Sequence, residues 1–318
     1  MLLHGPHPVL VDTGFGADVP ALLAWLDAQG VAPGRLRVVN THSHCDHSGG
    51  NHALQSRFGT PIAASATEAA PVNARSPDAG EARWLNQPLE PYAVQHTLRD
   101  GDVVDTGAQA WRVVATPGHT RGHLSLHDAQ AGVLVLGDAL HAADLGWLNP
   151  YREGADCLDR AADTLGRLAS LPAHTGYSGH GPAITNLPQA LERARRRVQS
   201  WREQPERIAW HACKRVFAHA LMLTGGATEA ELAPMLLACP WFHDHARLAF
   251  NTPPEDFVPV LVRETVRSDA ATWRDGRLQA VAPHRGPPPG WAAAPTAPAA
   301  WPPLPPGPAP SQGPWTAA

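Results

Sequence analysis

The chain carries a dense group of residue types that bind metals in the stretch THSHCDH at 41–47, which directly follows a predicted strand. In an extended segment His42 and His44 project to the same face, so their imidazoles can share a metal ion. Asp46 and His47 come after the turn and can reach a second ion. Cationic imidazoles packed this closely would repel one another, whereas neutral imidazoles around a divalent ion satisfy their lone pairs. The spacing therefore predicts a metal site.

Three further motifs each place a ligand-type residue just after a predicted strand. They are TPGH at 116–119 with His119, GD at 137–138 with Asp138, and GHG at 179–181 with His180. All three point to the same edge of a sheet as the first motif. The predicted metal site therefore comprises His42, His44, Asp46, His47, His119, Asp138 and His180.

Strand and helix patterns alternate over the first part of the chain. Strands are predicted at 8–12, 35–40, 60–65, 93–98, 103–105, 110–115, 122–127, 132–137 and 175–178, and helices at 19–26, 50–58 and 156–171. Residues 66–91 show no clear pattern. Strands mixed with flanking helices indicate an α/β (α+β) fold in which sheets are sandwiched between helical layers.

The pattern changes near residue 188, so the chain is predicted to have three parts. Residues 1–187 form the catalytic domain, and 188–282 form a helical module with a hairpin at Asp275-Gly276, which resembles a winged helix. Residues 283–318 consist mostly of Pro, Ala, Gly and Trp and are predicted to be a disordered tail.

Composition restricts the partners and the compartment. The formal charge of −4 gives no sign of a basic surface, which disfavours nucleic acid as a partner without excluding it. Neither a signal peptide nor an apolar run long enough for a membrane span is recognised, and the four widely spaced cysteines suit a reducing compartment. We therefore expect a cytoplasmic protein that acts on a small molecule and does not bind membranes. The sequence leaves open whether the chain forms a homodimer.

The motifs together resemble those of the metallo-beta-lactamase fold superfamily. The resemblance covers roughly residues 8–200 and is carried, in the right order, by VDTG at 11–14, THSHCDHSGG at 41–50, TPGHTRGH at 116–123, GD at 137–138 and GHG at 179–181. It implies a four-layer αβ/βα sandwich with the metal site at one edge. Family members usually have one or two further strands before the VDTG strand, so the resemblance also implies a truncated or misassigned start.

The resemblance also implies how the ligands divide between two divalent ions, with zinc favoured and iron or manganese as alternatives. One ion would be bound by His42, His44 and His119, the other by Asp46, His47 and His180, and Asp138 would bridge both. Asp12 would brace the metal loop by hydrogen bonding without touching a metal. Cys45 and His123 are interpreted as structural residues.

Further residues near the motifs are candidates for contact with a substrate. His141 lies at the offset from Asp138 where related lactonases have a tyrosine, so it is a candidate for polarising a substrate carbonyl; the alternative is a surface loop histidine. Trp147 and Tyr151 are candidates for lining the pocket, with packing of the loop as the alternative. No role is expected for the histidines of the helical module, which are His211, His219, His243 and His245.

These features predict a metal-dependent hydrolase that uses a hydroxide shared by two divalent ions, with Asp46 orienting it. The resemblance implies a thioester or a lactone or other ester as the favoured substrate, and it implies that a chain with Asp138 at this position is not a true beta-lactamase. The alternatives are an RNA or phosphodiester hydrolase, an oxidoreductase with a single iron that resembles persulfide dioxygenases, and a non-catalytic metal-binding regulator.

Overall fold

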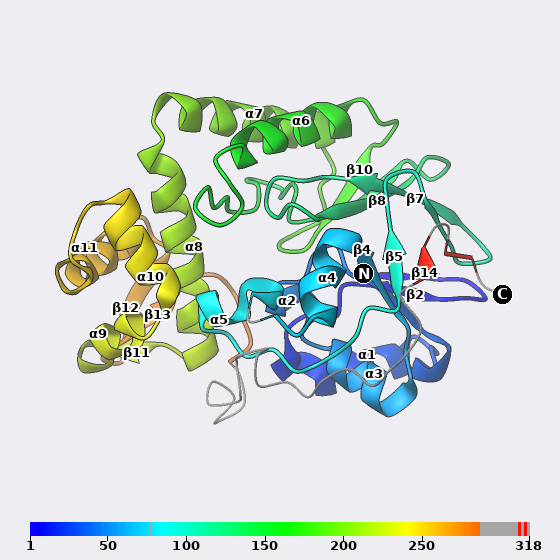
Figure 1. Cartoon of the computed structure of the whole chain (residues 1–318), viewed down its shortest axis with the longest axis horizontal. Coiled ribbons are helices and arrows are strands. Elements are labelled where there is room, and N and C mark those ends of the chain that lie inside the picture. The colour runs from blue at the N-terminus through cyan, green and yellow to red at the C-terminus, as the bar shows by residue number, and fades with distance from the viewer. Residues whose placement is uncertain (77, 287–310, 313–314, 317–318) are drawn as a thin grey trace.

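Two β-sheets packed face to face form the centre of the molecule, and helices cover their outer faces (Figure 1). The structure is a computed structural model that describes residues 1–76, 78–286, 311–312 and 315–316. A separate group of helices with a small third sheet lies at one side of this sandwich (Figure 1). The architecture is the predicted four-layer sandwich followed by a helical module.

The first sheet is parallel through its centre. Its order is β1 (Leu2–Leu3), β2 (Val9–Val11), β3 (Arg37–Val39), β4 (Ile62–Ser65), β5 (His96–Leu98) and β14 (Ser311–Gln312). β1 pairs antiparallel with β2, whereas β2, β3, β4 and β5 run parallel to one another. The carboxyl ends of β2 and β3 therefore meet at one edge of the sheet, where Asp12 and the metal loop begin.

The second sheet is a meander extended by one parallel strand. Its order is β10 (Thr175–Ser178), β9 (Val133–Gly137), β8 (Leu124–Asp128), β7 (Ala110–Ala115) and β6 (Val103–Asp105). β6 to β9 pair antiparallel, and β10 joins β9 in parallel. β7, β9 and β10 therefore share a direction, so the residues that follow them lie at one end of the sheet.

The strands are apolar on both faces because each face packs against another layer of the sandwich. In β2, Val9 and Val11 pack between the two sheets, whereas Leu10 packs outward against helices. Helices α1 (Val19–Ala28), α3 (Asn51–Phe58) and α4 (Ala66–Asn73) cover the first sheet. Helices α6 (Cys157–Ala169) and α7 (Leu187–Glu203) cover the second. Figure 1 shows these helices on opposite sides of the sandwich.

The stretch 66–91, which had no clear sequence pattern, forms short helices. α4 contains Pro71 and is followed by a 3-10 turn at Ala79–Glu81 and by α5 (Ala82–Leu85). Glu81 and Asn86, on either side of α5, adopt left-handed backbone conformations. These breaks keep each helix too short for a readable 3.6-residue period.

The helical module has the element order of a winged helix. Helix α8 (Glu206–Thr224) is followed by β11 (Ala227–Thr228), α9 (Glu229–Leu237), α10 (Pro240–Asp244), a π-helical turn at His245–Ala249, α11 (Pro254–Arg267), β12 (Ala271–Arg274) and β13 (Arg277–Ala280). Asp275 and Gly276 both have positive φ, as a two-residue type I′ hairpin requires. The predicted module and hairpin are thus confirmed. α7 itself packs on the sandwich through Leu191, Val198 and other apolar residues, and the division at residue 187 stays a prediction.

The first residues of the chain and the described part of its tail lie in or against the sheets. One short strand, β1, precedes the strand that was predicted first. Most of the predicted disordered tail falls outside the described residues. Its described part departs from the prediction, because the backbone of β14 pairs with the edge strand β5 and Trp315 stacks on His96. In the part of the chain that the structure describes, none of the helices has the length and apolar character needed to cross a membrane.

A buried carboxylate joins the sandwich to the helical module. Asp144, 8% exposed, lies in the loop after β9 and accepts hydrogen bonds from His211 Nε2 at 2.9 Å and from Arg215. Arg197 Nη1 lies 3.1 Å from its other carboxylate oxygen. Burial raises the pKa of Asp144, but these three cationic or polar partners outweigh burial and leave the pKa well below its ordinary value. The loop that carries Asp138 is therefore fixed to α7 and α8.

We expect Asp144→Asn to lower the free energy of unfolding by about 2 kcal/mol at pH 7, because hydrogen bonds to a buried charge are lost. Since the folded-state pKa is depressed, the contribution is complete above the unfolded value of about 3.9 and is lost progressively as the pH falls from there through the lower folded-state pKa. Denaturant titrations of parent and variant at pH 7 and pH 2.5 measure this. The control is Asp159→Asn, which breaks an exposed pair with Arg202 and should cost about 0.5 kcal/mol or less. Equal effects of the two substitutions would contradict the role given to Asp144.

Candidate metal centre

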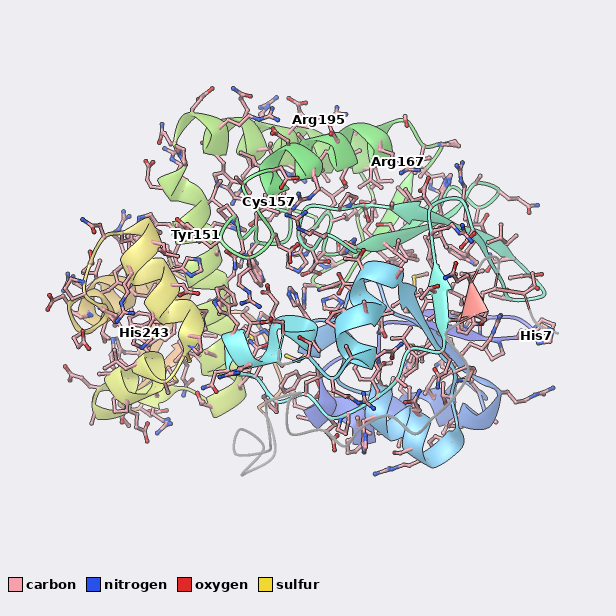
Figure 2. The ribbon with its side chains drawn as sticks, in the orientation of Figure 1. His7, Tyr151, Cys157, Arg167, Arg195 and His243 are labelled. Carbon is pink, nitrogen blue, oxygen red and sulfur yellow. The ribbon has the colours of Figure 1, made fainter. Side chains whose placement is uncertain are left out.

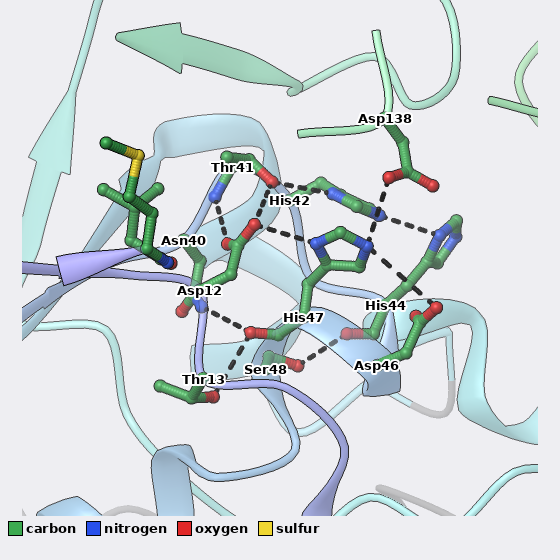
Figure 3. Close-up of polar contacts among 12 residues, drawn as sticks. Asp12, Thr13, Asn40, Thr41, His42, His44, Asp46, His47, Ser48 and Asp138 are labelled. Atoms are coloured by element: carbon green, nitrogen blue, oxygen red, sulfur yellow. Dashed lines mark hydrogen bonds and ion pairs between the residues drawn. The ribbon is translucent and has the colours of Figure 1, made fainter. Parts of the chain in front are cut away.

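Strand ends and one short helix bring the predicted ligands together. His42 and His44 follow β3, and α2 (Cys45–Ser48) carries Asp46 and His47. His119, Asp138 and His180 follow β7, β9 and β10. Figure 3 shows the rings of His42, His44 and His47 facing one space, with the Asp138 carboxylate beside it. The structure thus brings all seven predicted residues to one place.

Three ring nitrogens form a tight triangle. His42 Nε2 and His44 Nδ1 are 3.1 Å apart, and His119 Nε2 lies 3.2 Å from the first and 3.0 Å from the second. The three residues are almost fully buried, with exposed fractions between 0% and 4%. Three lone pairs this close repel one another unless a cation or shared protons lie between them. The triangle has the donor set of a metal position.

A second group lies next to the first. His180 Nε2 is 3.3 Å from His47 Nε2 and 3.2 Å from Asp46 Oδ2. Asp138 reaches both groups, since its Oδ1 is 3.3 Å from His47 Nε2 and its Oδ2 is 3.7 Å from His119 Nε2. Asp138 therefore occupies the place of a bridge between two metal positions.

Hydrogen bonds on the outer ring nitrogens orient the imidazoles. Trp147 O accepts a 2.7 Å hydrogen bond from His119 Nδ1, and Asp12 Oδ2 lies 2.8 Å from His47 Nδ1. Asp12 also accepts hydrogen bonds from the backbone N–H and the hydroxyl of Thr41, both at 2.8 Å. Each contact holds the proton on the outer nitrogen and leaves the inner lone pair free for a metal. Asp12 lies where the sequence placed it, outside the ligand group.

His44 is oriented by two residues that sequence reasoning did not identify in this role. Its Nε2 lies 3.7 Å from the buried carboxylate of Glu81, and the Trp147 ring stacks on its ring at 5.3 Å. Arg152 Nε lies 3.3 Å from Glu81 Oε1 and so fixes the position of this carboxylate. Glu81 comes from the stretch without a clear pattern, so no motif marked it.

The pKa values of His42 and His119 suit metal binding, whereas the Glu81 carboxylate outweighs burial and raises the pKa of His44. Burial, followed by the neighbouring histidines, lowers the pKa of His42 well below its ordinary value. Burial and the charge of His44 lower the pKa of His119 to about 4. Asp138 Oδ1 is buried without a hydrogen-bond partner among the described residues. Neutral imidazoles beside an unsatisfied carboxylate oxygen fit divalent metal ions.

The GHG motif is explained by close packing at the second group. A Cβ atom on Gly179 would lie 2.4 Å from His47 Cε1 and 2.6 Å from Asp138 Oδ1. Only a residue without a side chain fits between these two groups. The glycine therefore allows His180 to approach the second group.

Comparison with known proteins agrees with this geometry. The model of the metallo-beta-lactamase superfamily matches residues 2–196, which is more than half of the chain. The chain belongs to the metallo-beta-lactamase superfamily. Among superfamily relatives, the hydroxyacylglutathione hydrolase of Chelativorans sp. (strain BNC1) is 32% identical over 186 residues, covering 57% of this chain and 63% of the relative. That of Ectopseudomonas mendocina (strain ymp) is 32% identical over 179 residues, covering 56% and 58%. The chain thus spans less than two thirds of the length of these two relatives.

Solved structures of the superfamily share the fold. The metallo-beta-lactamase family protein TTHA1429 from Thermus thermophilus aligns with a TM-score of 0.56 at 23% identity, covering 88% of this chain and 92% of that one. TTHA1623, solved in a di-iron-bound form, aligns with a TM-score of 0.50 at 27% identity, covering 61% and 92%. The first likeness extends beyond the sandwich into the helical module.

Cys45 and His123 stay outside the ligand group, as interpreted from the sequence. Cys45 Sγ points away and donates a hydrogen bond to Gln87 Oε1 at 2.6 Å. His123 Nε2 accepts a 3.0 Å hydrogen bond from the backbone N–H of Asp138. His123 thereby fixes the backbone of the bridging position without facing the metal space.

The three candidates for substrate contact lie in different settings. His141 Nε2 is 3.3 Å from Asp138 Oδ1, and its ring lies 5.7 Å from that of His180. Trp147 packs between His44 and Trp84, so its contacts are those of a packing residue. Tyr151, which Figure 2 labels, is 41% exposed. It lines a cleft of about 360 Å³ whose wall also includes His44. Of the three, only His141 lies at the metal space itself.

One histidine of the helical module also reaches the centre. His219 Nδ1 on α8 lies 3.8 Å from Asp46 Oδ2, and its ring meets Phe15 edge-on at 5.9 Å. No role was expected for His211 and His219, because the sequence shows no acidic residue near either; the structure gives both an acidic partner, since His211 Nε2 also lies 2.9 Å from Asp144 Oδ2. No local spacing links residues 46 and 219, because only the packing of α8 on the sandwich brings them together.

We expect Asp12→Ala to weaken zinc binding by about 10- to 100-fold, because His47 loses the acceptor that orients its ring. Competition with a chromogenic chelator measures the affinity. Asp27→Ala, on the exposed face of α1, is the control and should leave it unchanged. Unchanged affinity in Asp12→Ala would show that the hydrogen bond at 2.8 Å does not support the site.

Proposed function

We propose that the chain is a metal-dependent hydrolase that cleaves a thioester, or a lactone or other ester, at a centre of two divalent ions. The observation that carries this proposal is the position of Asp138, whose two oxygens face both groups of ring nitrogens. The names of the superfamily relatives, hydroxyacylglutathione hydrolases, support the thioester class. Because the chain spans only part of those relatives, the substrate is an inference.

We assign the ligands by proximity. His42, His44 and His119 would hold one ion, and Asp46, His47 and His180 the other. Asp138, whose two oxygens face both groups, would contact both ions. Imidazole and carboxylate donors suit zinc, and they also suit iron or manganese. We favour zinc, and the metal content of the purified protein tests this choice.

Two ions held in this way would generate a nucleophile from water near neutral pH and polarise the scissile carbonyl. Asp46 lies at the second group with Oδ2 3.2 Å from His180 Nε2, so its other oxygen can accept a hydrogen bond from the attacking water and orient it. His141 faces the same space and can donate a hydrogen bond to a substrate oxygen as negative charge develops there. No side chain is needed as a covalent nucleophile.

We expect Asp46→Asn to lower kcat/KM by about 10²- to 10⁴-fold, because the nucleophile loses its orientation and a proton acceptor. The fold should persist, as judged by circular dichroism and thermal unfolding. Asp163→Asn, on the exposed face of α6, is the matched control and should retain full activity. Removal of metal with a chelator should abolish turnover, and added zinc should restore it. Activity that survives complete metal removal would contradict the mechanism.

A substrate panel tests the reaction class. Metal-defined protein is assayed on a hydroxyacylglutathione, simple thioesters, lactones, a chromogenic beta-lactam, a phosphodiester and short RNA. Turnover of thioesters or lactones, with two metal ions per chain, is the expected result. Cleavage of RNA alone, or one iron per chain with oxygen-dependent oxidation of a persulfide, would overturn the proposal.

A further inference from the structure

One face of helix α8 is turned toward the metal centre. His211, Arg215 and His219 are spaced four residues apart and therefore lie along one side of the helix. His211 and Arg215 bind Asp144 in the loop that also carries Asp138. The next member of the row, His219, reaches Asp46. The buried contact at Asp144 thus fixes the part of α8 that presents His219.

Exposure shows from which side a substrate can approach. The side chains of His44, His47 and His119 are 5%, 2% and 1% exposed. The side chain of His180 is 47% exposed and that of His219 is 25% exposed. The accessible side of the centre is therefore the side of the second group, where these two imidazoles flank Asp46.

The bonding of His219 differs from that of other histidines in the helical module. His243 Nε2 lies 2.8 Å from Leu237 O, and His245 Nδ1 lies 2.8 Å from Trp241 O, as is usual for histidines that support a fold. Within the described residues, the ring of His219 makes no hydrogen bond, and its polar contact is the one with Asp46 at 3.8 Å. Its nitrogens are thus available to a molecule that enters the centre.

We propose that His219 is a substrate-contacting residue of the metal centre, supplied by the helical module. This inference rests on the proposed hydrolase function. His219 forms a hydrogen bond with a polar group of the substrate portion that lies over Asp46 and His180. It therefore selects substrates that carry an amide, hydroxyl or carboxylate close to the scissile bond, over purely apolar thioesters or esters.

The test compares His219→Ala and His219→Asn with the parent on a hydroxyacylglutathione and on an apolar acyl thioester. His219→Ala should raise KM for the polar substrate by about 3- to 10-fold, the loss expected for one hydrogen bond, with little change in kcat. The KM for the apolar thioester should not change. His219→Asn should recover part of the loss, because the amide can replace a ring nitrogen as a hydrogen-bond donor.

The control is His243→Ala, which removes an imidazole of the same module whose Nε2 contacts Leu237 O (His243 is labelled in Figure 2). It should leave KM unchanged for both substrates. Zinc content and the melting temperature should be the same in the His219 variants and the parent. An unchanged KM in His219→Ala, or an equal rise for both substrates, would overturn the inference. Loss of one zinc ion per chain would also overturn it, because His219 would then be a ligand.

A binding measurement separates this inference from the proposed function. Mercaptoacetate, a small thiolate with a carboxylate, is titrated calorimetrically into zinc-loaded parent and variants. If the parent cleaves no thioester or ester, the proposed function fails, but a 3- to 10-fold weaker affinity in His219→Ala still supports the contact. Equal affinities would overturn the contact whether or not a substrate is cleaved.

Discussion

Five imidazoles and two carboxylates share one space at the edge of the sandwich, and the rest of the structure depends on keeping their lone pairs pointed inward. Nitrogens held 3.0 to 3.2 Å apart repel one another without a cation between them, so the surrounding protein must hold each ring in place. It does so at the outer nitrogens, through Trp147 O and Asp12. Asp12 adopts a positive φ of 58°, which turns its carboxylate toward both Thr41 and His47. The strained backbone at Asp12 thus serves to orient the ligand His47.

The loop after β9 carries most of these constraints. Asp138 faces both groups of ring nitrogens, and eight residues later Gly146 returns a hydrogen bond from its N–H to Asp138 O. Trp147 follows, with its carbonyl on His119 and its ring on His44. Asp144, which lies between Asp138 and Gly146, connects the loop to α7 and α8 through its contacts with Arg197 and His211. A single loop therefore couples both metal positions to the helical module. A change in the packing of that module should shift the positions of the ligands.

Local patterns in the sequence predicted most of the fold, because they depend on neighbouring residues. The apolar runs of β2 and β9, the helix with Leu22 and Leu26, and the Asp275-Gly276 turn all appear where their periods or turn chemistry placed them. The ligand residues were found for the same reason, since each follows a strand. Glu81 and His219 were missed because their partners lie 37 and 173 residues away, respectively, along the chain. Ser311 and Gln312, in a Pro-rich tail, pair with β5 through backbone groups, which carry no sequence signature.

The same long-range contacts explain why the shape of the helical module does not by itself indicate a nucleic-acid surface. Binding to a phosphate backbone requires free arginines and lysines along an accessible face. Here Arg197 and Arg215 bind Asp144, and Arg193 donates a hydrogen bond to Ala142 O. These three arginines thus hold α7 and α8 against the loop after β9. The side of α8 that carries His219 is turned toward the metal centre. Because arginines of α7 and α8 position the loop of Asp138, the winged-helix form alone does not indicate a nucleic-acid surface.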